Sequence, residues 1–170
     1  MGQEFLKIME PINAALTRAG GAGLTSIAPQ AEGVHYHAHT AMLGRQAILM
    51  RVAKITPTKT GQFVTLWKRN ASGLTVPISG SDEYQWFLVI VKDTGKEGFF
   101  LFSKEILLKQ KILSGTGSAG KRGFRIYPIW AITHSQQAAH TKTWQVNFFF
   151  ELPCITDSSL QRLRKLLQFK

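Results

Sequence analysis

Lysine and arginine residues are concentrated between residues 51 and 69, a stretch that contains no acidic residue. Its segment 56–61 (TPTKTG) combines hydroxyl groups, a lysine and a glycine backbone, all of which can bind phosphate oxygens. Trp67 adjoins two cations and can stack on a base of a single strand, or it can pack in the core, as large aromatic residues of strands usually do. The stretch predicts a polyanion interface made of Arg51, Lys54, Lys59, Trp67, Lys68 and Arg69.

A second basic stretch, residues 104–125, contains six cations and only one acid, Glu105. Its segment 115–121 (GTGSAGK) matches the GxxxxGK spacing of a P-loop. A P-loop also requires a strand before it, a helix after it and a hydroxyl residue after its lysine, whereas here a helix is expected before it, a strand after it, and Arg122 follows the lysine. We therefore expect no nucleotide hydrolysis at this loop and retain it as a phosphate contact formed by Lys121, Arg122 and Arg125.

The acidic residues allow a test for a metal-dependent nuclease of the restriction type. Such an enzyme needs about two carboxylates and a lysine around Mg²⁺ or Mn²⁺, usually with an acid two positions before the lysine. None of the ten acids has a lysine two positions later. The nearest candidates are Glu32, Asp82 and Glu83, with Lys92 as the lysine. A diverged nuclease therefore stays an alternative, and no metal or other cofactor is expected unless that alternative holds.

Histidine and cysteine offer fewer candidates. His35, His37 and His39 alternate, so in a strand they would share one face and either bind a metal or form a solvent-facing stripe. His134 and His140 have no evident partner in the sequence. Cys154 is the only cysteine, which excludes an intramolecular disulfide, and it reads as an inert thiol.

Helices are indicated by apolar residues at intervals of three and four. We expect them over residues 5–18, from an N-cap at Ser103 to about 112, over 136–143, and after Pro153. The last helix has a capping-box pattern at residues 158–161 and a leucine stripe at positions 160, 163, 166 and 167. Its opposite face is expected to carry Arg162, Arg164 and Lys165.

Strand patterns fill most of the remaining chain. The near-continuous apolar run 84–91 predicts a central strand buried on both faces, and the stretch 35–55 predicts a hairpin that turns at Leu43-Gly44-Arg45. Residues 145–152 fit either a last strand or an extension of the preceding helix. Further strands are expected at 62–68, 99–102 and 124–129, with loops at 20–32 and 114–120. The order predicts one α+β domain, residues 1–170, with a mixed, mostly antiparallel sheet flanked by helices.

The bulk composition indicates the class of partner and the cellular compartment. Lys and Arg outnumber Asp and Glu by 21 to 10, which gives a net charge of +11, and such a field attracts polyanions. No stretch approaches the ~20 apolar residues of a membrane helix, and residues 1–20 lack an apolar signal core. With a single cysteine as well, these features predict a cytoplasmic protein that does not contact membranes.

Four ordered blocks resemble the MepB-like family: 51–69 (RVAKITPTKTGQFVTLWKR), 99–114 (FFLFSKEILLKQKILS), 120–130 (GKRGFRIYPIW) and 138–152 (AAHTKTWQVNFFFEL). The resemblance implies a bacterial protein with a compact α+β core at residues 32–152, and the C-terminal basic helix at 153–170 lies outside the part that resembles the family. It also associates the core with restriction-endonuclease-like folds and nucleic-acid binding. The family's acidic residue after Tyr-Pro-x-Trp is Ala131 here, and the proline before the mid-chain helix is Ser103.

We therefore expect a non-enzymatic domain that binds nucleic acid or another polyanion through its cations. The first alternative is the diverged metal-dependent nuclease, a phosphodiesterase, at Glu32, Asp82 and Glu83. The second is a regulatory module that docks a protein partner on the basic helix 153–170.

Overall fold

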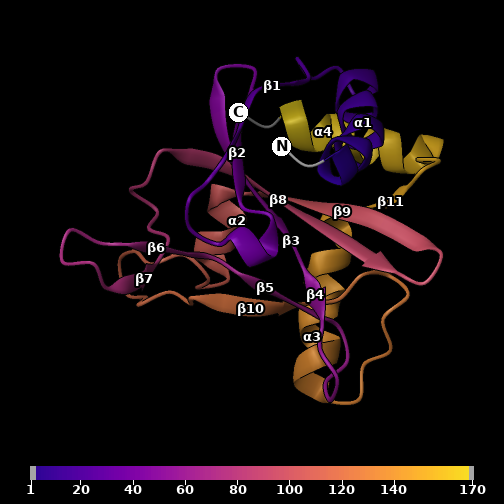
Figure 1. Ribbon diagram of the computed structural model, residues 1–170. Coiled ribbons are helices and arrows are strands. Elements are labelled where there is room, and N and C mark those ends of the chain that lie inside the picture. The colour runs from indigo at the N-terminus through magenta and orange to yellow at the C-terminus, as the bar shows by residue number, and fades with distance from the viewer. Residues whose placement is uncertain (1–2, 169–170) are drawn as a thin grey trace.

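A six-stranded sheet forms the centre of the molecule (Figure 1). The computed structural model describes residues 3–168. Within them β3 and β8 pair in parallel and the other neighbours of this sheet pair antiparallel, so the predicted mixed, mostly antiparallel sheet is confirmed. In spatial order the strands are β1 (Leu24–Pro29), β2 (His39–Leu43), β3 (Gln46–Val52), β8 (Tyr84–Asp93), β9 (Lys96–Ser103) and β11 (Phe149–Leu152).

The predicted burial of strand β8 on both faces is also confirmed. Alternate residues of a strand point to opposite faces. Trp86, Leu88 and Ile90 join the core on one face of the sheet, while Phe87, Val89 and Val91 join the core on the other. The sheet is therefore the middle of three layers.

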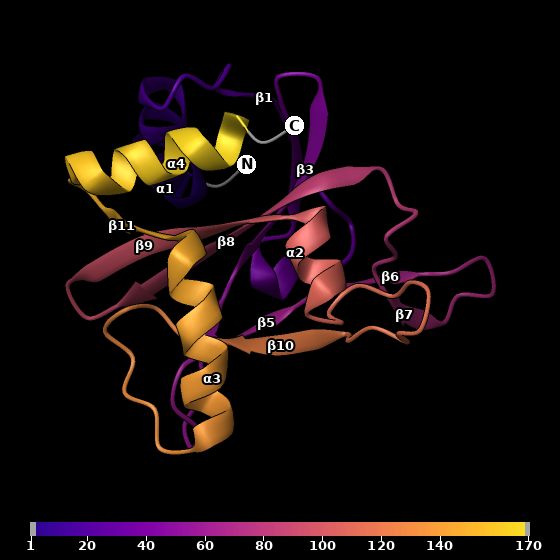
Figure 2. The same cartoon turned by 180° about the vertical axis from the view of Figure 1, so that it is seen from behind.

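Helices α1 (Gln3–Arg18) and α4 (Asp157–Gln168) cover one face of the sheet (Figure 2). Their apolar stripes meet there, with Ile12, Leu16 and Leu163 each 0% exposed. The N-cap of α4 is Thr156, whose Oγ1 accepts a hydrogen bond from the Ser159 amide at 3.2 Å. The predicted capping box thus lies two residues too late, and the leucine stripe of α4 packs into the core on this face of the sheet.

The sequence predicted that Arg162 would lie on an exposed basic face of α4, and for this residue the prediction is wrong. Its Nη1 donates to the Val146 carbonyl and its Nη2 to the Phe149 carbonyl, each at 2.8 Å. The guanidinium also lies 4.8 Å from the centre of the Phe150 ring. Burial lowers its pKa. This side chain therefore joins α4 to the segment that leads into β11, and the helix offers a weaker docking surface than the sequence suggested.

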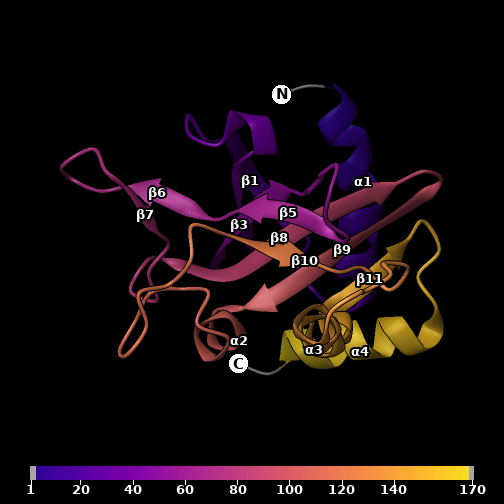
Figure 3. The same ribbon diagram turned by 90° about the horizontal axis from the view of Figure 1, so that it is seen from below.

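The opposite face of the sheet is covered by a smaller sheet and two helices (Figure 3). The small sheet contains β10 (Gly123–Ile126), β5 (Gln62–Thr65) and β4 (Lys54–Ile55), in that order. The two helices on this face are α2 (Lys104–Lys109) and α3 (Gln136–Gln145). A separate two-stranded ribbon is formed by β6 (Trp67–Arg69) and β7 (Thr75–Pro77). The ribbon extends to the side of the molecule (Figure 1).

Several boundaries differ from the sequence prediction. β1 lies where a loop was expected, because this edge strand buries only Leu24 and so lacks a period-two pattern. The expected strand 62–68 is divided into β5 and β6 at Leu66. The Ser103 N-cap is confirmed, since its side chain accepts from the Ile106 amide, but α2 ends at Lys109, and Lys111 has a φ of 57°. Of residues 145–152, the first ends α3, the next three form η2 (Val146–Phe148) and the last four form β11.

Candidate functional site

A cavity of about 680 Å³ opens between the small sheet, helix α3 and the segment 56–61. Helix α3 stands beside β10, and its N-terminal end extends past the small sheet (Figures 1 and 2). The sheet therefore forms the floor of the cavity and the helix forms one wall. The lining residues with aromatic, cationic or imidazole side chains are Lys59, Phe63, Lys121, Phe124, Arg125, Tyr127, His134, His140 and Trp144.

The floor is set by the register of the small sheet. Phe63 on β5 pairs with Lys54 on β4 and with Arg125 on β10, so these three side chains share one face. The Arg125 guanidinium lies 5.9 Å from the centre of the Phe63 ring. Gly123 allows this packing, because a Cβ there would lie 2.6 Å from the Cζ of Phe63. Phe63 thus lies between two cation positions on this face; Arg125 lines the cavity, whereas the Lys54 Nζ lies 4.8 Å from the centre of the Tyr36 ring.

One buried side-chain amide holds helix α3, the wall of the cavity, against the small sheet that forms its floor. Gln145, 0% exposed, accepts from the Tyr127 amide at 2.8 Å and donates to the Arg125 carbonyl at 2.9 Å, which fixes the end of α3 against β10. Trp144 is half-buried, and its ring centre lies 5.5 Å from that of Phe102 and 6.4 Å from that of Phe148. The position of the Trp144 ring is therefore fixed by the core.

Arg125 shapes the segment that carries Lys59. Its Nη1 donates to the carbonyls of Lys59, Thr60 and Gly61 at 3.2–3.4 Å, and its Nη2 donates to the Thr56 hydroxyl. These bonds turn the carbonyls of the segment inward, toward a single guanidinium. Arg125 therefore positions Lys59 and also adds its own charge to the cavity.

The charge of the cavity has one sign. Lys59, Lys121 and Arg125 line it, and no Asp or Glu does. Lys59 and Lys121 are exposed, and within residues 3–168 none of the three takes part in an ion pair. Exposed Arg122 follows Lys121 in the chain, and Lys54 shares the floor face. The structure thus brings Lys59 of the first basic stretch together with Lys121 and Arg125 of the second.

Replacing Arg125 with lysine tests its positioning role, because the charge stays while the fork of donors is lost. We expect amide exchange of residues 58–61 to become about tenfold faster, as expected for the loss of one or two net hydrogen bonds. Hydrogen exchange followed by mass spectrometry measures this. Arg122→Lys is the matched control, since exposed Arg122 donates no hydrogen bond to this segment in the described structure; equal exchange in both variants would contradict the assignment.

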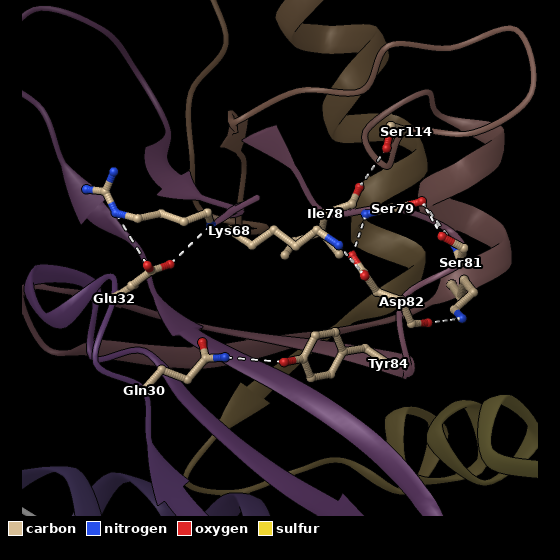
Figure 4. A network of polar contacts seen from close by, with 11 residues as sticks. Gln30, Glu32, Lys68, Ile78, Ser79, Ser81, Asp82, Tyr84 and Ser114 are labelled. Carbon is tan, nitrogen blue, oxygen red and sulfur yellow. Dashed lines mark hydrogen bonds and ion pairs between the residues drawn. The ribbon is translucent and has the colours of Figure 1, made fainter. Parts of the chain in front are cut away.

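A separate groove of about 550 Å³ is lined by five other predicted residues, namely Glu32, Trp67, Lys68, Asp82 and Glu83. Figure 4 shows its polar network, in which Lys68 pairs with Asp82. The other Asp82 oxygen accepts from the Ser79 amide at 2.8 Å. The groove thus combines the acids predicted for a nuclease with cations predicted for phosphate binding.

The second ion pair of this groove joins Arg69 Nε to Glu32 at 3.3 Å. Lys68 and Arg69 are therefore neutralised by acids and do not add to the cationic cavity, contrary to the predicted interface. Trp67 is half-buried, and the Arg69 guanidinium lies 5.7 Å from its ring centre, so the ring packs under a cation at the surface and stays outside the core. In residues 3–168, no three His, Cys, Asp or Glu side chains are grouped so as to hold a metal ion.

Arg51 is only 4% exposed and so does not present its guanidinium to a ligand, which corrects its place in the predicted interface. Its Nη1 donates to the Met50 carbonyl at 2.8 Å. Desolvation lowers its pKa to about 10, and the nearby Tyr84 partly offsets this. It follows that the folded state disfavours the charged form; this cost is fully present at neutral pH and is relieved as the pH rises above about 10.

Arg51→Met is therefore expected to stabilise the protein at pH 7. An apolar side chain of similar length removes the buried charge, and such replacements often raise the free energy of unfolding by roughly 1–4 kcal/mol. Urea denaturation measures the change. Arg45→Met, at an exposed turn, is the control and should change little. A destabilised Arg51→Met variant would show that the guanidinium contributes net favourable contacts.

The alternating histidines do not share a strand face. His35 lies in the 3-10 helix η1 (Val34–Tyr36), His37 has a left-handed backbone with φ of 45°, and only His39 lies in β2. The His39 ring stacks on Phe5 with centres 3.8 Å apart, and burial lowers its pKa. The sequence pattern was therefore misread because the local backbone is not extended.

Sequence reasoning missed most of the other lining residues of the cavity, among them Phe63, His134, His140 and Trp144. The sequence of α3 does contain a pattern that could have indicated this wall of the cavity, because Gln137, Thr141 and Trp144 recur at helical spacing and lie on one face. That face is not apolar enough to stand out as a packing stripe. What it faces depends on β5, more than seventy residues earlier in the chain, and no local pattern reports that contact.

The fold and cavity define an α+β domain with a cationic, aromatic-lined site on its smaller sheet. A family model described as MepB-like matches residues 30–151, and the chain belongs to that family. The crystal structure of MepB is similar to it with a TM-score of 0.76 and 27% identity, over 91% of this chain and 99% of that chain. No curated protein matches it.

A bacterial homing endonuclease is also similar, with a TM-score of 0.40 and 13% identity over 84% of this chain and 91% of that chain. At that score the likeness carries no functional argument. Within residues 3–168, no helix has the length and apolar composition needed to cross a membrane.

Proposed function

We propose that the protein binds nucleic acid by its phosphates, at the cationic cavity. The observation that carries the proposal is the lining of that cavity, which contains Lys59, Lys121 and Arg125 and no carboxylate. Cations without acidic partners attract anions, and a net charge of +11 extends that attraction beyond the site. The groove around Asp82, by contrast, neutralises its cations internally.

The spacing of the cations fits a polymer better than a single small anion. Lys54 and Arg125 are separated by one intervening strand on the same face, so their backbones lie about 10 Å apart. Lys121 and Arg122 extend the positive surface along the segment before β10. One phosphate group cannot contact all of these side chains, whereas successive phosphates of a chain can.

A salt titration tests the proposal. Anisotropy of a labelled 12-nucleotide single strand, measured with the whole protein from 50 to 300 mM salt, should give a slope of about −0.7 in log affinity for each phosphate neutralised. Contacts from Lys59, Lys121 and one further cation predict a slope near −2. Absence of binding at 50 mM salt, or binding without a salt slope, would exclude the proposal.

A metal-dependent nuclease is the second candidate, favoured by one observation: Glu32, Asp82 and Glu83 line the same groove. Mg²⁺ or Mn²⁺ there would have to compete with Lys68 for Asp82 and with Arg69 for Glu32. We therefore expect supercoiled DNA to stay intact with either metal. Cleavage that disappears in the exposed-site variant Glu83→Gln would instead establish the nuclease.

A further inference from the structure

We propose that a second hollow binds a small aromatic carboxylate that carries an N–H donor. The hollow has a volume of about 330 Å³ and is lined by residues of β4, of the C-terminal end of β8 and of the segment 128–134. It adjoins the cationic cavity, with which it shares Lys59, Thr60 and His134. The proposal adds a small-molecule site to the protein and does not depend on nucleic-acid binding.

Gln62, in β5, gives this hollow a hydrogen-bond acceptor without a partner. It pairs with Ile55 on β4 and with Ile126 on β10, so its side chain lies on the face of the small sheet opposite to the floor of the cavity. Gln62 lines the hollow and is 3% exposed, and its Nε2 donates to the Lys92 carbonyl at 2.9 Å. Within residues 3–168 its buried Oε1 accepts no hydrogen bond. Because an unpaired buried acceptor is costly, a ligand that supplies an N–H group at this end of the hollow is favoured.

The more exposed part of the hollow is apolar. Ile55 is 59% exposed and Ile132 is 70% exposed, and both line the hollow together with the half-buried Trp130. Two large aliphatic side chains at one hollow leave apolar surface in contact with water, and a flat apolar ligand would cover that surface. The Trp130 ring adds an aromatic surface, against which a second aromatic ring packs favourably.

The hollow is small, and its wall is fixed before any ligand binds. A volume of about 330 Å³ lies near the lower end of the range for pockets that hold small organic ligands, so the hollow fits one fused ring system. Lys142 on α3 donates to two carbonyls of the segment 128–134, at 2.8 and 2.6 Å. The Trp130 ring packs edge to face against Phe149 of the core, with ring centres 5.4 Å apart. Binding therefore requires little ordering of this wall.

The charge of the hollow favours an anionic ligand. Its lining contains one lysine, Lys59, and one acid, Asp93, and both are exposed. Asp93 lies opposite Lys96 in the β8–β9 hairpin, and its Oδ1 accepts from the Thr94 amide at 2.7 Å, so its charge is partly offset. Lys59 takes part in no ion pair in the described part of the chain. A ligand carboxylate would therefore find its counter-charge at Lys59, and the net charge of +11 favours the same sign of ligand.

Two methylated forms of indole-3-acetate test the donor on the unmodified protein. One form carries its methyl group on the ring nitrogen and the other on the adjacent ring carbon, so the two have the same size and charge, and only the second keeps the N–H group. We expect the second to bind about tenfold more tightly, because only it can donate to Gln62 Oε1. Isothermal titration calorimetry measures both affinities. Equal affinities, or no binding of either form at millimolar concentration, would overturn the proposal.

A neutral probe tests the carboxylate. The acetamide of the carbon-methylated form keeps the ring and its N–H group but lacks the charge. It should bind about threefold more weakly than the acid, which is the size of effect expected for an exposed ion pair. In Lys59→Gln the acid and the amide should bind alike. An amide that binds the unmodified protein as tightly as the acid does would contradict the anionic class of ligand.

Gln62→Leu locates the donor contact, with Gln30→Leu in the groove around Asp82 as the matched control. The ratio of affinities between the two methylated forms is taken within each protein, so a general loss of affinity cancels. It should fall to near one in Gln62→Leu and stay about tenfold in Gln30→Leu. A tenfold ratio that persists in Gln62→Leu would overturn the assignment of Gln62 as the acceptor.

A second pair of variants tests the apolar wall at exposed positions, where neither change should unfold the protein. Ile132 lines the hollow, whereas Ile129, 57% exposed in the same segment, does not. Ile132→Ser should weaken both methylated forms about fivefold through lost apolar contact, and Ile129→Ser should leave their affinities unchanged. Equal effects of the two changes would overturn the placement of the ligand in this hollow.

Discussion

Reversing Lys59 and Lys121 together, as Lys59→Glu with Lys121→Glu, is expected to weaken single-strand binding about a hundredfold at 50 mM salt. Each phosphate contact contributes about −0.7 to the salt slope, which at that concentration corresponds to about 0.9 log units of affinity. The two contacts therefore account for nearly two log units. The slope itself should fall by about 1.4. Anisotropy titrations at several salt concentrations measure both quantities.

The control for this prediction is a double reversal of equal charge on the other side of the molecule. Lys7 in α1 and Arg45 in the β2–β3 turn are both exposed, and in Figure 1 these elements lie toward the top of the molecule, whereas α3 lies at the bottom. Lys7→Glu with Arg45→Glu lowers the net charge by the same amount. If binding followed net charge alone, both variants would weaken it equally, and this result would contradict binding at the cavity.

The sequence predicted those parts of the fold that depend on neighbours in the chain. The run 84–91 alternates between two buried faces, and the Ser103 cap needs only the amide of Ile106, three residues on. The expected order of elements around 115–121, with a helix before it and a strand after it, is confirmed for the same reason, since α2 precedes this segment and β10 follows it. In these cases the residues that determine the local structure lie close to each other in the chain.

The distribution of the cations could not be predicted in that way. Lys68 meets Asp82 across fourteen residues, and Arg69 meets Glu32 across thirty-seven. The sequence identified both the cations and the acids as candidates, yet assigned them to different sites. Arg51 was taken for a ligand contact because charge gives no signal of burial, and its strand β3 lies inside the sheet. Pairing between distant segments decides which charges remain free.

Shortening Leu163 in the C-terminal helix, as Leu163→Ala, is expected to lower the free energy of unfolding by about 2–5 kcal/mol, the range for buried leucines truncated to alanine. The side chain is 0% exposed and packs in the same core as Ile12, Leu16 and Phe150. This cost follows from the lost burial and from the cavity left behind. Urea denaturation measures it, with Leu6→Ala as the control, since Leu6 is 46% exposed and should cost well under half as much.

Deleting residues 157–170 extends this argument to the whole helix. The deletion exposes the apolar surface of α1 and the sheet that Leu160, Leu163 and Leu166 cover, and it leaves the carbonyls of Val146 and Phe149 without the Arg162 guanidinium. We expect the shortened chain to lose cooperative unfolding and, because α3 leads directly into that segment, to lose binding at the cavity as well. A folded, binding-competent chain lacking this helix would mean that residues 153–170 are a separable docking element after all, and that their packing against α1 contributes little.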